Sequence, residues 1–276
     1  KEAVICNSGN ANTCNANGIE IAEKMSDLLA EKLGITAEDV VVASTGVIGQ
    51  PLDIEPIANG INPLADGLSE KGGEFAAEAI MTTDTVKKEV AVEFELSGKT
   101  CRIGGIAKGS GMIHPNMATM LVFITTDVCI SSKMLKTALS GDIADTFNMI
   151  SIDGDTSTND MVTVLASGMA ENTEITEQND DFKTFMKALN TVTVALCRMI
   201  AGDGEGATKL LECEVGGAKD KQTAKTVETT GIYPFSRRSV MGVMFTPVIF
   251  PTKPRRLSFF SASISLPSIP EMPMAL

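Results

Sequence analysis

The sequence is poor in the side chains from which most catalytic and metal sites are built. It holds a single histidine, His114, so no site can use two imidazoles and little room is left for a Ser-His or Cys-His relay. Its six cysteines are scattered without a CxxC pair, which fits reduced thiols in a cytoplasm better than a disulfide-stapled secreted fold. We therefore expect a cytoplasmic protein without a metal site, whose catalytic base is a group other than histidine.

Positive charge and long apolar runs are also scarce. The chain has 23 basic and 35 acidic residues, a net charge of -12, whereas phosphate backbones and anionic membrane surfaces need a surplus of Lys and Arg. No apolar run nears the roughly 20 residues that span a bilayer. The most apolar stretch, 240–250, is short and contains Pro247. We expect a soluble protein that binds neither nucleic acid nor membrane.

Apolar periodicity predicts an alternation of strands and helices, which indicates a mixed α/β fold. Expected strands are 3–6, 40–43, 90–96, 102–107, 120–125 and 209–215. Expected helices are 21–33, 54–61, 75–81, 133–147 and 182–200. Gly34 stands where a left-handed cap would end the first helix, and the polar run 7–12 predicts turns after the first strand.

The composition changes after about residue 231. Seven of the eleven prolines and five basic residues lie in 231–276, with Glu271 as the single acid. No helical or strand period continues there, and each proline removes a backbone donor. We expect an aberrant tail, as from a wrong reading frame, that does not pack as a native domain.

The run KGSGMIHPNMATML (108–121) carries the most chemical information. Thr119 stands at the entrance to a buried strand, directly after Ala118, and the preceding glycines and Pro115 allow unusual dihedrals. A hydroxyl in this setting can attack its own preceding carbonyl, and the new N-terminal α-amine can then serve as its general base. Spacing alone favours the plainer interpretation that Thr119 is an ordinary strand residue.

This run resembles the cleavage segment of the bifunctional ornithine acetyltransferase and glutamate N-acetyltransferase family of arginine biosynthesis. Thirteen of its fourteen positions match that family's KGSGMI-xPNMATML pattern, and His114 fills the variable place. The resemblance implies cleavage between Ala118 and Thr119, with Thr119 as nucleophile. It also implies a layered α/β sandwich with mixed sheets, of the self-cleaving threonine-nucleophile type.

Two further runs resemble elements of the same family, in the same order. NSGNAN (7–12) matches an early element, and STGVIG (44–49) matches the element that forms the oxyanion hole. The resemblance gives Thr45 and Gly46 that role, through a side-chain hydroxyl and a backbone amide. Without Thr119, an ordinary turn after a strand would be the better interpretation of Thr45 and Gly46.

Two later runs contain spaced carboxylates. DGDTSTND (153–160) lacks the glycine and glutamate placement of an EF-hand, so we expect turns that brace the nucleophile strand and no bound metal. GDGEGATK (202–209) lacks the Gly-Lys-Ser/Thr of a phosphate loop. The family resemblance makes Glu205 a substrate-binding residue, together with Thr82, Lys108 and Thr119. Without the resemblance, Thr82 would be interpreted as part of a surface turn and Lys108 as a solvated lysine.

The resemblance extends from about residue 3 to about 226. It implies a catalytic core over 1–165, missing its opening segment, and the start of a smaller domain over 166–228, followed by the aberrant tail 229–276. The family continues with a Trp in an NWGR context and with a final Asn and Thr that close the pocket, whereas this chain has no Trp. We therefore expect the chain as given to be inactive.

The implied reaction moves an acetyl group from N-acetylornithine to glutamate through an acetyl-threonine intermediate. No cofactor is expected, and acetyl-CoA stays open as a co-substrate. The two self-cleaved chains are expected to associate and to form an oligomer of such pairs. Two alternatives stay open: a hydrolase or aminopeptidase with the same amino-terminal nucleophile, and an inactive fragment of the transferase.

Overall fold

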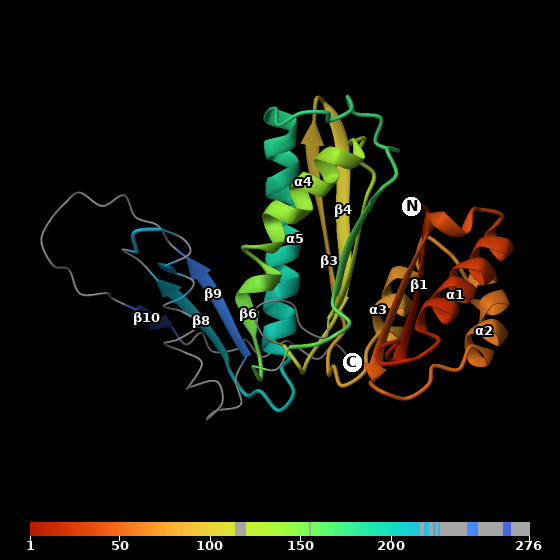
Figure 1. The fold of residues 1–276 in the computed structure, drawn as a ribbon. Coiled ribbons are helices and arrows are strands. Elements are labelled where there is room, and N and C mark those ends of the chain that lie inside the picture. The colour runs from red at the N-terminus through yellow and green to blue at the C-terminus, as the bar shows by residue number, and fades with distance from the viewer. Residues whose placement is uncertain are drawn as a thin grey trace, which may run out of the picture.

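A four-stranded mixed sheet forms the centre of the molecule (Figure 1). The structure, a computed structural model, describes residues 1–113, 120–154, 156–215, 218–220, 223–224, 226, 242–247 and 262–265. In sheet order the central strands are β3 (Lys88–Leu96), β4 (Lys99–Lys108), β5 (Leu121–Thr126) and β7 (Met161–Ala166). β4 is antiparallel to β3 and to β5, and β7 is parallel to β5. The expected strands at 90–96, 102–107 and 120–125 are confirmed, and β7 was not expected.

Helix α5 (Asp180–Gly202) packs on β3 and β4 and supplies much of the main core (Figure 1). It begins where the Asn179 side chain accepts a 2.9 Å hydrogen bond from the Phe182 amide, which satisfies one free donor of the first turn. Side chains spaced three or four residues apart form its fully buried stripe: Phe185, Leu189, Val192, Leu196 and Ile200. Burying each contributes about 1.5–3 kcal/mol, so this stripe holds the helix on the sheet. α4 (Ser132–Ile143) packs against α5.

A second layer contains the parallel strands β1 (Ala3–Asn10) and β2 (Val40–Val47). The helices α1 (Gly18–Leu33) and α2 (Glu55–Asp66) pack on it, and α1 ends at Gly34 with a left-handed φ of 71°, as expected. The prediction of turns from residue 7 onward is wrong for 7–10, which continue β1 opposite the end of β2. Main-chain pairing satisfies the backbone whatever the side chains are, so the polar residues here did not end the strand.

Alternation along β1 joins the two layers, because successive side chains of a strand point to opposite faces. Ile5 points toward the helices, while Val4 and Cys6 pack toward the central sheet. That interface contains the buried side chains Ala43, Ile80, Leu121 and Phe123. It also includes α3 (Gly73–Ala79), which contacts β3 and β4.

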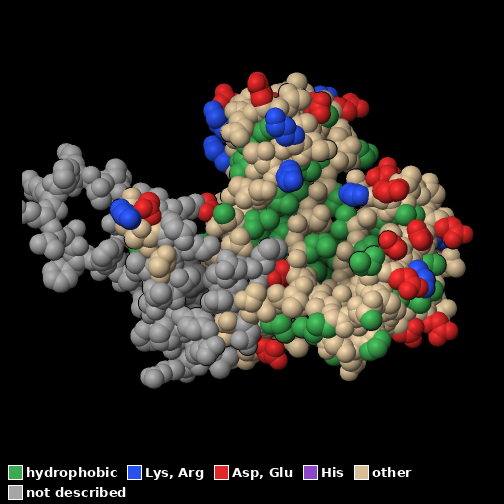
Figure 2. All heavy atoms as spheres, in the orientation of Figure 1, with side chains coloured by type: hydrophobic (Ala, Val, Ile, Leu, Met, Phe, Trp, Pro, Cys, Tyr) green, Lys and Arg blue, Asp and Glu red, His purple; other side chains and the backbone are tan. Residues whose placement is uncertain are grey.

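Between the layers the surface is hollowed and lined with apolar side chains (Figure 2). A pocket of about 490 Å³ lies there. Its lining includes Val4, Cys6, Ile80, Val90, Ile106 and Phe123. The β1-β2 layer therefore packs on the central sheet without filling the space between them.

A third sheet has the order β10-β8-β9-β6. Its strands are β6 (Ile150–Ser151), β8 (Leu210–Val215), β9 (Gly242–Pro247) and β10 (Ala262–Ser265). β9 pairs with β8 and β6, and β10 pairs with β8. The expectation that no strand forms after 231 is wrong for these two segments. β8 supplies ladder partners for both β9 and β10, and this pairing does not require an apolar period in the added strands. The remainder of 231–276 lies outside the described residues.

Two aspartates from the 153–160 run hold the chain at the described ends of the connection between β4 and β5. Asp153 accepts hydrogen bonds from the amides of Met112 and, at 2.9 Å, Ile113. Asp160 accepts a 3.0 Å hydrogen bond from the Met120 amide. The expected bracing role of this run agrees with these contacts.

The mixed α/β class is confirmed by these sheets and helices. The division into a core over 1–165, a second domain over 166–228 and a tail over 229–276 stays a prediction. Among the residues that the structure describes, none of the helices is long and apolar enough to cross a membrane.

Replacing Asp160 by Asn should stabilise the fold at about pH 8 and not at about pH 4. Burial raises the pKa of Asp160 from 3.8 to about 6, against the opposing Met120 hydrogen bond. Between these values the folded state binds more protons than the unfolded state, so stability falls as pH rises, and the full cost is present above about 6. Asparagine keeps an acceptor for the Met120 amide and carries no charge.

Urea unfolding at the two pH values measures this effect. Asp180→Asn is the matched control, because Asp180 is an exposed carboxyl whose pKa is held low by the hydrogen bond from Lys183. That control should gain nothing at the higher pH. An Asp160→Asn protein less stable than its parent at about pH 8 would contradict the assignment.

Candidate active site

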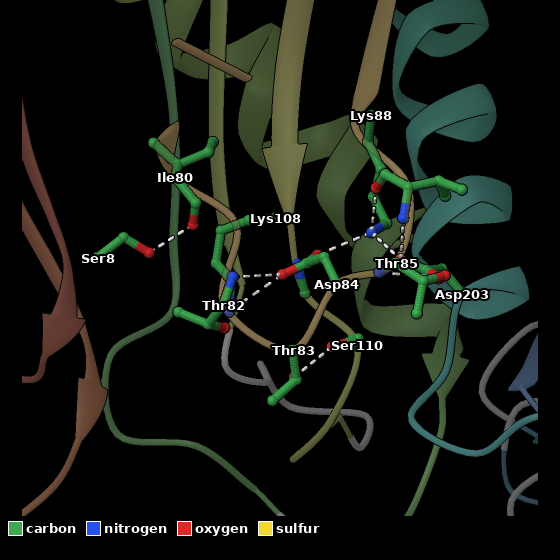
Figure 3. A network of polar contacts seen from close by, with 12 residues as sticks. Ser8, Ile80, Thr82, Thr83, Asp84, Thr85, Lys88, Lys108, Ser110 and Asp203 are labelled. Atoms are coloured by element: carbon green, nitrogen blue, oxygen red, sulfur yellow. Dashed lines mark hydrogen bonds and ion pairs between the residues drawn. The ribbon is translucent and has the colours of Figure 1, made fainter. Parts of the chain in front are cut away.

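The loop that follows β4 gathers polar groups from distant parts of the sequence (Figure 3). Its first residue after the strand, Gly109, has a φ of 155°, which is unfavourable for other residues. The Gly109 amide donates a 2.6 Å hydrogen bond to Asp84. The Ser110 hydroxyl lies 2.6 Å from the Thr83 hydroxyl. The Ser110 backbone carbonyl accepts a 2.5 Å hydrogen bond from the Glu205 amide. The loop is thus fixed on two sides.

Lys108, the last residue of β4, is a buried cation with a loose partner. Its side chain is 3% exposed, and its Nζ lies 3.8 Å from Asp84 Oδ2. Burial lowers the pKa of Lys108, the Asp84 carboxylate opposes that shift, and the nearby Lys88 ammonium lowers the pKa further. The ammonium therefore has capacity for a second anion.

Asp84 also binds the segment that contains Thr82. The Thr82 amide donates a 3.1 Å hydrogen bond to Asp84 Oδ2, and the Thr82 side chain is exposed. Thr82 and Lys108, two predicted substrate-binding residues, are therefore held by one carboxylate.

Glu205, the third predicted substrate-binding residue, lies against the same loop. A Cβ placed on Gly111 would lie 2.7 Å from Glu205 Oε2, closer than such atoms approach. A larger residue at 111 would therefore require the Glu205 carboxylate to shift. Thr82, Lys108 and Glu205 therefore all lie at this loop, and their role in substrate binding stays a prediction.

The predicted oxyanion-hole residues lie near the end of β2. Thr45 is fully buried, and its hydroxyl has no hydrogen-bond partner among the described residues. Gly46 has a φ of 124°, and a Cβ there would lie 2.2 Å from the Gly9 carbonyl carbon and oxygen. Gly46 therefore cannot be replaced without moving β1. A buried hydroxyl without a partner costs about 1–3 kcal/mol, which is the cost expected where a ligand oxygen completes the site.

One contact connects this strand pair to the loop cluster. Ser8, which faces Thr45 across the β1-β2 ladder, donates a hydrogen bond to the Ile80 carbonyl, two residues before Thr82 (Figure 3). Cys6 lies near enough to Lys108 for each to influence the pKa of the other, and burial raises the pKa of the Cys6 thiol to about 12. The end of β2 and the Lys108 cluster thus belong to one region of the molecule.

The predicted nucleophile Thr119 and its neighbour Ala118 lie outside the described residues. The flanking residues are well anchored. The Ile113 carbonyl accepts a 2.8 Å hydrogen bond from Ile152, and the Met120 carbonyl accepts a 3.0 Å hydrogen bond from Met161. Lys108 and Leu121 are ladder partners, so the chain leaves β4 and returns to β5 at the same end of the sheet.

Three buried charged residues beside this loop were not predicted: Asp84, Lys88 and Asp203. Lys88 Nζ is fully buried and donates to Asp84 Oδ1 at 2.7 Å and to Asp203 Oδ2 at 2.6 Å (Figure 3). One signal was available. Positions 90 and 96 face inward in β3, and extending that period of two backward places residue 88 on the inner face.

Comparison with known proteins identifies the same family that the sequence motifs indicate. A family model described as the ArgJ family matches residues 1–232. A relative from Caldanaerobacter subterraneus subsp. tengcongensis, named arginine biosynthesis bifunctional protein ArgJ, is 52% identical over 225 residues, 81% of this chain and 56% of the relative. Arginine biosynthesis bifunctional protein ArgJ 1 from Clostridium acetobutylicum is 51% identical over 224 residues, 81% of this chain and 55% of the relative.

A solved structure is also similar: the crystal structure of arginine biosynthesis bifunctional protein argJ from Bacillus halodurans. It is 41% identical with a TM-score of 0.38, over 43% of this chain and 61% of that chain. The chain spans about half the length of the curated relatives it matches. The family match covers most of the sequence, and this chain belongs to the ArgJ family.

Proposed function

We propose that this chain is a cytoplasmic acyltransferase that moves an acetyl group from N-acetylornithine to glutamate, after cutting itself between Ala118 and Thr119. This proposal departs from the inactivity expected from the sequence. The observation that carries the proposal is the gathering of Thr82, Lys108 and Glu205 around the loop that leads from β4 toward residue 119. A cation, Lys108, and a carboxylate, Glu205, at the same loop suit an amino-acid substrate, which carries both charges. The names of the relatives, arginine biosynthesis bifunctional proteins, agree with this reaction.

Self-cleavage begins with attack of the Thr119 hydroxyl on the Ala118 carbonyl carbon. The C–N bond between the two residues breaks, the hydroxyl proton passes to the departing amine, and an ester replaces the amide. Water then hydrolyses the ester, which leaves an Ala118 carboxylate and a Thr119 with a free α-amine. That amine is the base for the next step, so the single histidine of the chain is not needed as a base.

In acetyl transfer, the Thr119 hydroxyl attacks the acetyl carbonyl of N-acetylornithine and ornithine departs as the amine. The glutamate amine then attacks the acetyl-threonine ester and restores the hydroxyl. Thr45 and Gly46 are proposed to stabilise the oxyanion in both halves. Each preorganised donor contributes roughly 3 to 4 kcal/mol in such a site. The Thr45 hydroxyl supports this role because it is already desolvated and has no partner among the residues that the structure describes.

We also propose that the two cleaved chains stay associated and assemble into an oligomer of such pairs. β4 precedes the cut and β5 follows it, yet the two strands are ladder neighbours from Lys108 and Leu121 onward. This pairing and the shared core favour association over release of either piece. Acetyl-CoA is kept as a candidate second acetyl donor.

Thr119→Ala should leave the chain uncut, whereas the parent yields pieces 1–118 and 119–276. The reason is that only the hydroxyl can form the ester. Intact-mass spectrometry of freshly purified protein measures both pieces. Thr119→Ser keeps a hydroxyl and is the matched control that should retain some processing. A Thr119→Ala protein that still splits at this bond would end the proposal.

Acetyl transfer should yield N-acetylglutamate from labelled N-acetylornithine and glutamate, in a Thr119-dependent manner. The assay on the 276-residue chain distinguishes the three alternatives that the sequence leaves open: a transferase, a hydrolase and an inactive fragment. Labelled acetate in place of N-acetylglutamate would indicate the hydrolase. Neither product, from a chain that is folded, would indicate the inactive fragment.

Thr45→Val should lower the rate of acetyl transfer roughly 100-fold while leaving the thermal midpoint unchanged or higher. Valine has nearly the shape of threonine, and the hydroxyl that it removes is buried without a partner among the described residues. Thermal unfolding and the transfer assay are measured on the same preparation. A full-rate Thr45→Val protein would remove Thr45 from the oxyanion hole.

A further inference from the structure

The buried charges around Asp84 are unequally paired. Lys88 Nζ lies 2.7 Å from Asp84 Oδ1 and 2.6 Å from Asp203 Oδ2, both within hydrogen-bond range. Lys108 Nζ lies 3.8 Å from Asp84 Oδ2, beyond that range. Two carboxylates thus satisfy Lys88, whereas Lys108 shares one of them at a longer distance.

The remaining capacity of Asp84 is taken up by the backbone. Its Oδ1 accepts the Gly109 amide at 2.6 Å and its Oδ2 accepts the Thr82 amide at 3.1 Å. Burial alone would raise the pKa of Asp84, but the hydrogen bonds from Lys88 and Gly109 outweigh it and hold the pKa below its usual value. Asp84 is therefore an ionised group whose direction is fixed mainly by Lys88 and two amides.

We propose that Lys88 is a positioning residue which occupies Asp84 and so keeps the Lys108 ammonium available for a substrate carboxylate. The inference rests on the proposed role of Lys108 in substrate binding. Without Lys88, Lys108 would be the one cation left beside Asp84 among the described residues, in a medium of low dielectric where opposite charges attract strongly. Lys108 would then close on Asp84, and its charge would be neutralised before a substrate arrived.

The charged and titratable groups around Lys108 define what should be measured. Asp84 faces it from the segment before β3, Lys88 from the start of β3, and Cys6 from β1. Lys88 lowers the pKa of Lys108 and Asp84 raises it. Loss of Lys88 should therefore move the titration of Lys108 upward, and the affinity for a substrate carboxylate shows whether Lys108 has also become less available.

The experiment compares Lys108 titration midpoints in the full chain by NMR of lysines labelled at Cε, with Lys108→Arg to assign the signal. The test variant is Lys88→Met combined with Asp203→Asn, which removes one charge of each sign and avoids an uncompensated buried carboxylate. We expect its midpoint to rise by about one pH unit. L-glutamate affinity, measured by calorimetry, should fall about tenfold.

Two controls isolate the effect. Asp203→Asn alone keeps Lys88 on Asp84 and should leave the Lys108 midpoint unchanged. Lys87→Met removes the neighbouring lysine, which is partly exposed and pairs with Glu74, and should also change nothing. If the double variant does not fold, Lys88→Gln with Asp203→Asn keeps hydrogen-bond donors without the charge and should show the same rise.

An unchanged or lower Lys108 midpoint in a folded double variant would overturn the proposal. If the parent chain does not bind L-glutamate, Lys108 has no role in binding this substrate. The proposal that Lys88 keeps Lys108 available for a substrate carboxylate then fails as well. The Lys108 midpoint then still reports whether Lys88 controls Asp84. A failed proposed function and a failed role for Lys88 are therefore distinguishable.

Discussion

The buried ammonium of Lys88 is the contact that ties the candidate site to the fold. It binds Asp84, in the segment before β3, and Asp203, at the end of α5. Asp203 in turn accepts hydrogen bonds from the amides of Thr85 and Val86, which closes the two segments on each other. Removing one partner of such a buried pair typically costs 3–5 kcal/mol, about as much as a large core truncation. Lys88 thus connects the two carboxylates that lie closest in sequence to Thr82 and Glu205.

Close backbone approach is the second constraint on the site. Gly46 faces Gly9 across the β1-β2 ladder with no room for a Cβ, and Gly111 leaves space for the Glu205 carboxylate. Neither position could hold alanine without a shift of its neighbour. Gly46 is therefore explained by a backbone contact between segments far apart in the sequence. Gly49 and Gly109 are explained by their positive φ values of 79° and 155°.

The site also shows how local charge can oppose the charge of the whole molecule. A net charge of -12 disfavours polyanionic partners, yet the loop after β4 presents a buried lysine that is only loosely paired. Burial lowers the pKa of Lys108 because the charged form loses its hydration, and Asp84 offsets part of that loss. The proposed binding of a single small carboxylate is therefore compatible with a net charge that disfavours extended anions.

The sequence by itself determined most of the elements and predicted a chemistry for the site. Apolar periodicity located α5 and the core of β4 and β5, because these segments bury one stripe or alternate faces. The run 108–121 predicted Thr119 as the nucleophile. Tertiary structure decided the rest. The extension of β1 through Asn10 and the strands β9 and β10 depend on ladder partners far away in the chain. The pairing of Lys88 with Asp84 and Asp203 was equally hidden, because a lone lysine is ordinarily solvated and becomes a core residue only where folding supplies carboxylates to receive it.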